Sequence, residues 1–125
     1  MAITVTPKIA PVPHLKKRPE FLRVAATRKK WVAPGLILQV RRRLEAETEN
    51  AKARVGFTVS RKVGNAVRRN RARRRLRAVV DQVMPLHARD GYDFVVIGRA
   101  GTIRRTFAGL LNDLETALKK MGTYN

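Results

Sequence analysis

Apolar positions along this chain recur with two periods, one typical of helices and the other of strands. Pro19 suits the first turn of a helix, where the missing N–H of a proline would have no partner. Phe21 and Leu22 follow it, so we expect a short helix from about residue 19 to residue 27. A last helix is expected from about 104 to 120, where apolar residues recur at steps of three and four.

The longest expected helix lies in the middle of the chain. Asn65 is a suitable N-cap and Pro85 is expected to end the helix. Its buried stripe is defined by apolar residues at helical spacing: Ala72, Leu76, Val79, Val80 and Val83.

Four segments have the composition of strands. Trp31-Val32 precedes a Pro34-Gly35 turn, and residues 36–40 and 54–60 are rich in residues that favour strands. A hairpin is the simplest connection between residues 36–40 and 54–60, across an acid-rich loop at 45–52. Residues 92–98 form a nearly continuous apolar run, as expected at the centre of a sheet. The order of helix, two or three strands, helix, strand and helix predicts an α+β fold, a two-layer sandwich with its helices on one face of the sheet.

The length of the chain limits it to one domain. With 125 residues, of which 44% are hydrophobic, the chain can bury one modest core and is too short for two. Residues 1–14 contain Pro7, Pro11 and Pro13 and show no apolar period, so we expect a flexible leader before a single domain at 15–125. The absence of cysteine excludes disulfides and thiolate metal sites. With no membrane-length apolar run and no signal-like start, we expect a cytoplasmic protein.

The charge balance indicates a polyanionic partner. Lys and Arg number 28 against 9 Asp and Glu, which gives a formal charge of +19 and favours nucleic acid. A membrane surface is disfavoured, because the basic helix lacks large apolar residues opposite its charges. An independent nuclease would need clustered carboxylates or paired histidines, whereas the acids here are scattered and His14 and His87 have no metal-spaced partner. We expect Asp93, within a strand, to form an ion pair with Arg99 rather than to catalyse a reaction.

The arginines of the central helix are crowded. Six Arg–Arg pairs between residues 68 and 77 stand three or four positions apart, and each costs the free helix roughly 0.2–0.5 kcal/mol. Arg68 and Arg69 lie on nearly the same azimuth as the buried stripe, but charged groups cannot enter an apolar core unpaired. The first turn of the helix should therefore extend past the sheet and offer a phosphate-binding surface.

The run Lys62-Val63-Gly64-Asn65-Ala66-Val67, followed by Arg69-Asn70-Arg71, closely resembles the RNR motif of the bacterial ribonuclease P protein component. Other landmarks of that family occur in the same order. They are Leu15-Lys16-Lys17 before Glu20-Phe21, the strand at 56–60, and the strand at 92–97 with Arg99 after it. The resemblance covers about residues 15–118.

The resemblance implies a fold like the second domain of a small-subunit ribosomal protein, with a left-handed crossover around the basic helix. It implies two partners, a large catalytic RNA and the 5′ leader of precursor tRNA, and a role in the endonucleolytic removal of that leader. In such a ribonucleoprotein endoribonuclease the RNA carries the catalysis, magnesium ions are held mainly by RNA, and the protein alone is not catalytic. We expect the free protein to be a monomer with no tightly bound cofactor.

The resemblance also assigns residues to two surfaces. The leader cleft is expected to contain Phe21, Phe57 and Trp31, although Phe21 and Trp31 could instead be core residues. Ala25 and Gln39 stand where relatives can carry aromatic residues, so leader binding should be more electrostatic here, since each stacked base contributes about 1–3 kcal/mol. The RNA-binding motif and its flank comprise Arg61, Lys62, Arg68, Arg69, Asn70, Arg71, Arg73, Arg74 and Arg77.

The main alternative is a ribosomal protein or a general RNA chaperone of similar fold and charge. A histone-like binder of duplex DNA has less support, because no dimeric arm or minor-groove wedge is visible. A preference for precursor over mature tRNA would separate a ribonuclease P subunit from a general RNA chaperone.

Overall fold

The computed structural model describes residues 11–44 and 52–125. The first ten residues of the expected leader, and all of the expected acid-rich loop except Lys52, lie outside the described residues. The elements, in chain order, are α1 (Arg18–Ala26), β1 (Lys30–Val32), β2 (Leu36–Arg42), β3 (Arg54–Thr58), the short η2 (Arg61–Val63), α2 (Ala66–His87), β4 (Tyr92–Gly98), α3 (Ala100–Arg104) and α4 (Phe107–Lys120).

The four strands form one mixed sheet in the order β1-β2-β4-β3. Strand β2 is antiparallel to both β1 and β4, whereas β3 is parallel to β4 and is joined to it through α2. The expected hairpin between residues 36–40 and 54–60 is therefore wrong, because β4 lies between these two strands. The central place of β4 is as its continuous apolar run predicts. The left-handed sense of the connection through α2 stays a prediction.

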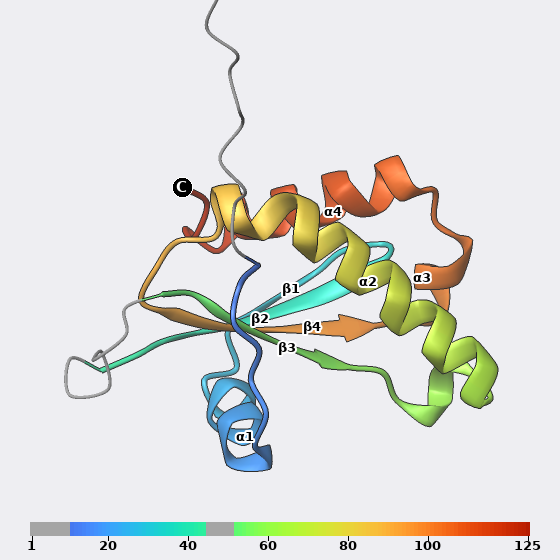
Figure 1. Cartoon of the computed structure of the whole chain (residues 1–125), viewed down its shortest axis with the longest axis horizontal. Helices are drawn as coiled ribbons and strands as arrows, with labels where there is room; N and C mark the ends of the chain where they lie inside the picture. The colour runs from blue at the N-terminus through green and yellow to red at the C-terminus, as the bar shows by residue number, and fades with distance from the viewer. Residues whose placement is uncertain (1–10, 45–51) are drawn as a thin grey trace, which may run out of the picture.

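Helices cover both faces of the sheet. Figure 1 shows α2 and α4 above the sheet and α1 below it. Side chains alternate along β4, so Phe94 and Val96 join the main core while Val95 joins a smaller cluster with Leu15 and Val24. The predicted α+β class is confirmed, but the expectation that all helices lie on one face is wrong. A central strand that is apolar on both sides needs cover on both sides.

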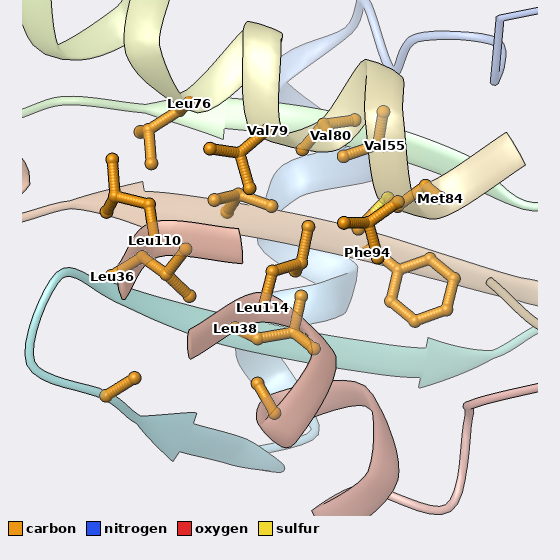
Figure 2. Close-up of a cluster of buried hydrophobic side chains, with 14 of the residues drawn as sticks. Leu36, Leu38, Val55, Leu76, Val79, Val80, Met84, Phe94, Leu110 and Leu114 are labelled. Carbon is orange, nitrogen blue, oxygen red and sulfur yellow. The ribbon is translucent and has the colours of Figure 1, made fainter. Parts of the chain in front are cut away.

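The main core lies between the sheet and the α2 and α4 helices. Figure 2 shows side chains from both helices pointing toward those of the strands. All five residues of the stripe predicted for the central helix are buried, and Leu76 has no exposed surface. The apolar period of α2 therefore positions its opposite, basic side toward solvent.

Two helix boundaries differ from expectation. Helix α2 continues past Pro85 to His87, because Pro85 would omit only one hydrogen bond, to the carbonyl of the exposed Asp81. The expected last helix corresponds to α4, which begins at Phe107 rather than near residue 104, and the short α3 before it was not predicted. Thr106 caps α4 by accepting a hydrogen bond from the N–H of Gly109 at 3.0 Å.

The segment before α1 is attached to the edge of β3. The Val55 N–H donates to the carbonyl of Pro13, and the Leu15 N–H donates to the carbonyl of Val55, both at 2.9 Å. Pro13 can take part because it contributes only its carbonyl. Pro13 and His14 were expected to belong to a flexible leader, but they extend the sheet by one bridge.

Candidate RNA interface

The N-terminal part of α2 extends past the ends of the strands, as the charge of its first turn predicts (Figure 1). Asn65 is the N-cap, and its Oδ1 accepts a hydrogen bond from the Arg68 N–H at 3.0 Å. Just before it, Gly64 has φ of 144°, a conformation that disfavours other residues. The Gly64-Asn65 pair of the sequence motif therefore sets the direction in which the basic helix starts.

Most side chains of the predicted RNA-binding set reach solvent. Arg69 and Arg73 are half-buried, and Arg73 Nη1 donates to Asn70 Oδ1 at 3.3 Å. The exposed members are Arg61, Lys62, Arg68, Asn70, Arg71, Arg74 and Arg77.

The charge of this surface is not neutralised by carboxylates of the described residues. The ion pairs found within residues 11–44 and 52–125 involve Asp93, Glu20 and Asp113, and none of them includes an arginine of α2. A concentrated positive field on an exposed helix attracts a polyanion strongly, and its effect weakens as salt concentration rises.

Arg75 differs from the other arginines of α2. Its Nε donates to the carbonyl of Thr102 at 3.0 Å, and its Nη2 donates to the carbonyl of Arg105. These bonds attach α2 to α3. Arg75 is not in the predicted set, and helical periodicity does not distinguish it, because it lies only at the edge of the buried stripe, as Arg68 does.

A cleft lies on the other face of the sheet, beside α1. It brings Phe21, which the resemblance assigned to the cleft, together with Ala25 and Gln39, the two positions where relatives can carry aromatic residues. Its lining residues are Lys16, Arg18, Phe21, Leu22, Ala25, Gln39, Thr58, Val95 and Ile97.

Gly56 shapes this cleft, and sequence reasoning did not single it out. A Cβ added to Gly56 would lie 2.4 Å from Phe21 Cε1 and 3.2 Å from Leu15 Cβ. The Phe21 ring therefore packs directly on the backbone of β3. An isolated glycine within a strand pattern is the signal that could have indicated such a close approach.

Phe57 and Trp31 do not lie in the cleft, so both predictions are wrong. The register aligns Trp31 with Leu38, Leu38 with Val96, and Val96 with Phe57. Residues aligned in this way point to the same face, and Leu38 and Val96 belong to the main core. Both aromatic rings therefore lie on the face opposite Phe21.

The two rings have other neighbours. Phe57 lies beneath the Arg77 guanidinium, 5.8 Å from its Cζ to the ring centre, and its ring meets that of His14 edge to face at 5.4 Å. Trp31 packs partly against the main core, with Lys120 Nζ 5.8 Å from the ring centre. These surroundings support the alternative that Trp31 is a core residue.

Asp93 forms ion pairs, as expected, but with other arginines. Its carboxylate accepts from Arg43 Nη1 and from Arg54 Nη2, each at 2.8 Å, and Arg54 Nη1 also reaches Glu20 Oε2 at 3.0 Å. Arg99 instead donates to the carbonyl of Ala33 at 2.7 Å. Arg99 follows the end of β4, whereas Asp93 lies near its start. The Asp93 network attaches α1 to the sheet next to the cleft.

Glu20 has a pKa below its ordinary value. Burial raises the pKa of this carboxyl, but the backbone N–H groups of Lys17 and Lys16 and the charge of Arg54 together lower it further than burial raises it. The two N–H groups lie 2.9 and 3.3 Å from Glu20 Oε1. Glu20 is therefore ionised and holds the start of α1 in place.

The described residues offer no metal site. Within them, no three His, Cys, Asp or Glu side chains converge as metal ligands would. His87 stacks on Tyr124 with the ring centres 4.5 Å apart, and its Nδ1 lies 3.2 Å from the carbonyl oxygen of Asn125. Of the helices in the described ranges, none has the length and apolar character needed to span a membrane.

Three comparisons relate this chain to known proteins. The family model for ribonuclease P matches residues 11–122. The ribonuclease P protein component of Paramagnetospirillum magneticum is 59% identical over 109 residues, which cover 87% of this chain and 82% of that protein. The corresponding protein of Gluconacetobacter diazotrophicus is 52% identical, over 87% of this chain and 90% of its own length.

Solved structures give the same relation. The RNase P protein of Staphylococcus aureus superposes with a TM-score of 0.70 at 28% identity, covering 90% of this chain and 97% of that one. The RNase P protein of Thermotoga maritima superposes with a TM-score of 0.69 at 26% identity, covering 86% of this chain and 96% of that one.

Proposed function

This chain belongs to the ribonuclease P protein family, and we propose that its α2 surface and its α1 cleft are the places where it holds RNA. Proteins of this family are the protein subunits of a ribonucleoprotein endoribonuclease that removes the 5′ leader of precursor tRNA, and this chain has that function. The single observation that supports two separate RNA-binding surfaces is their placement on opposite faces of the sheet, on either side of the edge strand β3.

The α2 surface is proposed to bind the catalytic RNA. Its exposed arginines have no carboxylate partner within the described residues, and phosphates would relieve their mutual repulsion. Charge-assisted hydrogen bonds from arginine to phosphate are shorter and stronger than neutral ones, and often bidentate. A rigid helix that is capped at Asn65 and attached to the core can present them without reorganisation.

The α1 cleft is proposed to bind the single-stranded leader. Phe21 offers one stacking surface, and Lys16 and Arg18 line the same cleft and can meet phosphates. Ala25 and Gln39 leave no further aromatic ring there. Leader binding should accordingly depend on charge more than on stacking.

Magnesium ions are proposed to be held by the RNA and the substrate. The described residues do not fit a protein-held magnesium site, because their carboxylates are scattered or paired with arginines. The protein therefore contributes binding and orientation, while chemistry at the scissile phosphate belongs to the RNA. We further propose that the free protein is a monomer.

The test compares precursor and mature tRNA in the assembled ribonucleoprotein. We expect this protein to tighten binding of the precursor much more than that of mature tRNA. Arg74→Ala with Arg77→Ala should weaken assembly with the catalytic RNA by about 1–3 kcal/mol. The matched control is Arg23→Ala with Arg89→Ala, which removes the same charge from exposed positions outside both surfaces.

A general RNA chaperone is the alternative. It would tighten both tRNA forms equally, and the control variant would weaken RNA binding as much as the α2 variant. That result would remove the support for two specialised surfaces.

A further inference from the structure

A second groove runs between the start of α2 and the short helix α3. Three arginines from two elements border it, Arg68 and Arg71 from α2 and Arg104 from α3. Val63, Val67 and Ile103 supply its apolar lining. No carboxylate lines it, and none of its three arginines forms an ion pair within the described residues. The groove is thus apolar between cationic rims.

Val67 is the unusual residue of this groove. It is 74% exposed, more than any other large hydrophobic residue in the described part of the chain. It lies among arginines, where a polar residue would serve solubility better. An exposed apolar side chain between cations matches a ligand that combines an apolar face with negative charge.

The α3 side of the groove is held rigidly. Arg75 binds the carbonyls of Thr102 and Arg105, which flank Ile103 and Arg104. Thr102 is fully buried, and its hydroxyl donates to the carbonyl of Gly35 at 2.6 Å. Arg75 is therefore a positioning residue that fixes Ile103 and Arg104 relative to α2. Such preorganisation lowers the entropy that binding would otherwise lose.

We propose that this groove binds an unpaired nucleotide of the catalytic RNA, with the base against Val67 and Ile103 and the flanking phosphates at Arg71 and Arg104. This inference rests on the proposed function of α2. An unstacked nucleotide has a flat apolar face bordered by phosphates, and proteins hold such bases between aromatic or apolar side chains. In a duplex the face of each base is covered by its stacked neighbours. A duplex could therefore contact the arginines but could not place a base face against Val67. Arg104 thereby becomes an RNA-contacting residue outside the basic helix.

Two substitutions separate the contributions of charge and apolar contact. Arg104→Ala should weaken assembly with the catalytic RNA about tenfold, the size of one charge-assisted contact, and should reduce the salt slope by about 0.7. Val67→Ser should weaken assembly several-fold and leave the salt slope unchanged. The matched controls are Arg89→Ala and Leu86→Ser. Leu86 is 56% exposed near the other end of the same helix.

The absence of cysteine allows the bound RNA to be located directly. Ala100 is exposed and lines the groove, so Ala100→Cys can carry a tethered cleaving reagent. We expect cuts confined to an unpaired stretch of the catalytic RNA, and Ala108→Cys on the exposed side of α4 should not produce them. Cuts spread along a duplex, cuts in the tRNA leader, or equal cutting from both sites would overturn the proposal.

The outcomes also separate this proposal from the proposed function. If Arg74→Ala with Arg77→Ala weakens assembly while Arg104→Ala and Val67→Ser do not, the groove proposal fails and the role of α2 stands. If the Arg74 and Arg77 variant has no effect, the role of α2 fails first.

Discussion

Replacement of Gly56 by alanine tests whether the Phe21 ring and the backbone of β3 together form the leader site. The added methyl group would lie 2.4 Å from Cε1 and 2.6 Å from Cζ of Phe21. No carbon–carbon contact is that short, so either the ring or the strand must move. The added methyl group would also lie only 3.2 Å from Leu15 Cβ, and we expect the Phe21 ring to shift within the cleft that it lines.

The cost to folding should be moderate. Overpacking of one methyl group destabilises a protein by typically 1–3 kcal/mol, and the backbone of Gly56 has no positive φ that would add strain. Replacing glycine by alanine also lowers the conformational entropy of the unfolded chain, which offsets about 0.4–1 kcal/mol of this destabilisation. We therefore expect a net loss of about 0–2.6 kcal/mol in the free energy of unfolding. The protein should remain folded.

The decisive assay measures precursor and mature tRNA binding with the assembled ribonucleoprotein. Gly56→Ala should reduce the preference for the precursor roughly tenfold, the scale of one lost base stack, and should leave assembly with the catalytic RNA unchanged. Adding Phe21→Leu should restore stability, because the smaller side chain relieves the clash, but not the preference. An unchanged preference in a folded Gly56→Ala protein would refute the role of the Phe21 ring in the cleft.

Two further substitutions address stability. Leu76→Ala should lower the free energy of unfolding by about 2–5 kcal/mol, because Leu76 is fully buried; urea denaturation would measure it, and RNA binding of the remaining folded protein should be normal. Glu20→Gln tests the lowered pKa. The ionised Glu20 carboxylate stabilises the fold above its unfolded pKa of about 4.3. This stabilisation is lost as pH falls through the lower folded pKa, so the difference in stability between wild type and variant should shrink as pH falls below the unfolded pKa. A difference independent of pH would contradict the role of the Glu20 charge.

Local patterns predicted the elements well where one physical effect dominated. The buried stripe of α2 and its Asn65 cap follow from helical periodicity and from the need to satisfy free N–H groups. The central place of β4 follows from its continuous apolar run. The cost of burying Arg68 and Arg69 unpaired also predicted that the start of α2 would extend past the sheet.

The sheet order and the faces of the aromatic residues could not be obtained in this way. Strand pairing joins segments far apart in the sequence, and β4 pairs with both β2 and β3 in place of the simple hairpin. Phe57 and Trp31 were assigned to the cleft without a register. A shift of one residue reverses the face of every side chain, so neither assignment could be made from spacing alone.

The sequence predicted where the candidate surfaces lie but not how their side chains are positioned. Arg75 looked like any other arginine of α2, and only the position of α3 reveals its carbonyl partners. Gly56, an isolated glycine within a strand pattern, could have indicated the close approach of another side chain. The α3 groove requires two segments far apart in sequence, Val67 and Arg71 with Arg104, which no local pattern connects.

The strong charge of α2 is compatible with a stable fold because the opposite side of the helix belongs to the main core. Four buried side chains of the stripe, Leu76, Val79, Val80 and Val83, each contribute about 1.5–3 kcal/mol. Their sum of about 6–12 kcal/mol exceeds the roughly 1–3 kcal/mol of repulsion among the arginines. The repulsion among the arginines is therefore small beside the burial of the stripe and does not by itself prevent the helix from forming without RNA. Acids placed among its arginines would stabilise the free protein but would compete with phosphates for the same guanidinium groups. The carboxylates of Asp93, Glu20 and Asp113 instead pair with arginines outside α2, which leaves the field of α2 available to RNA.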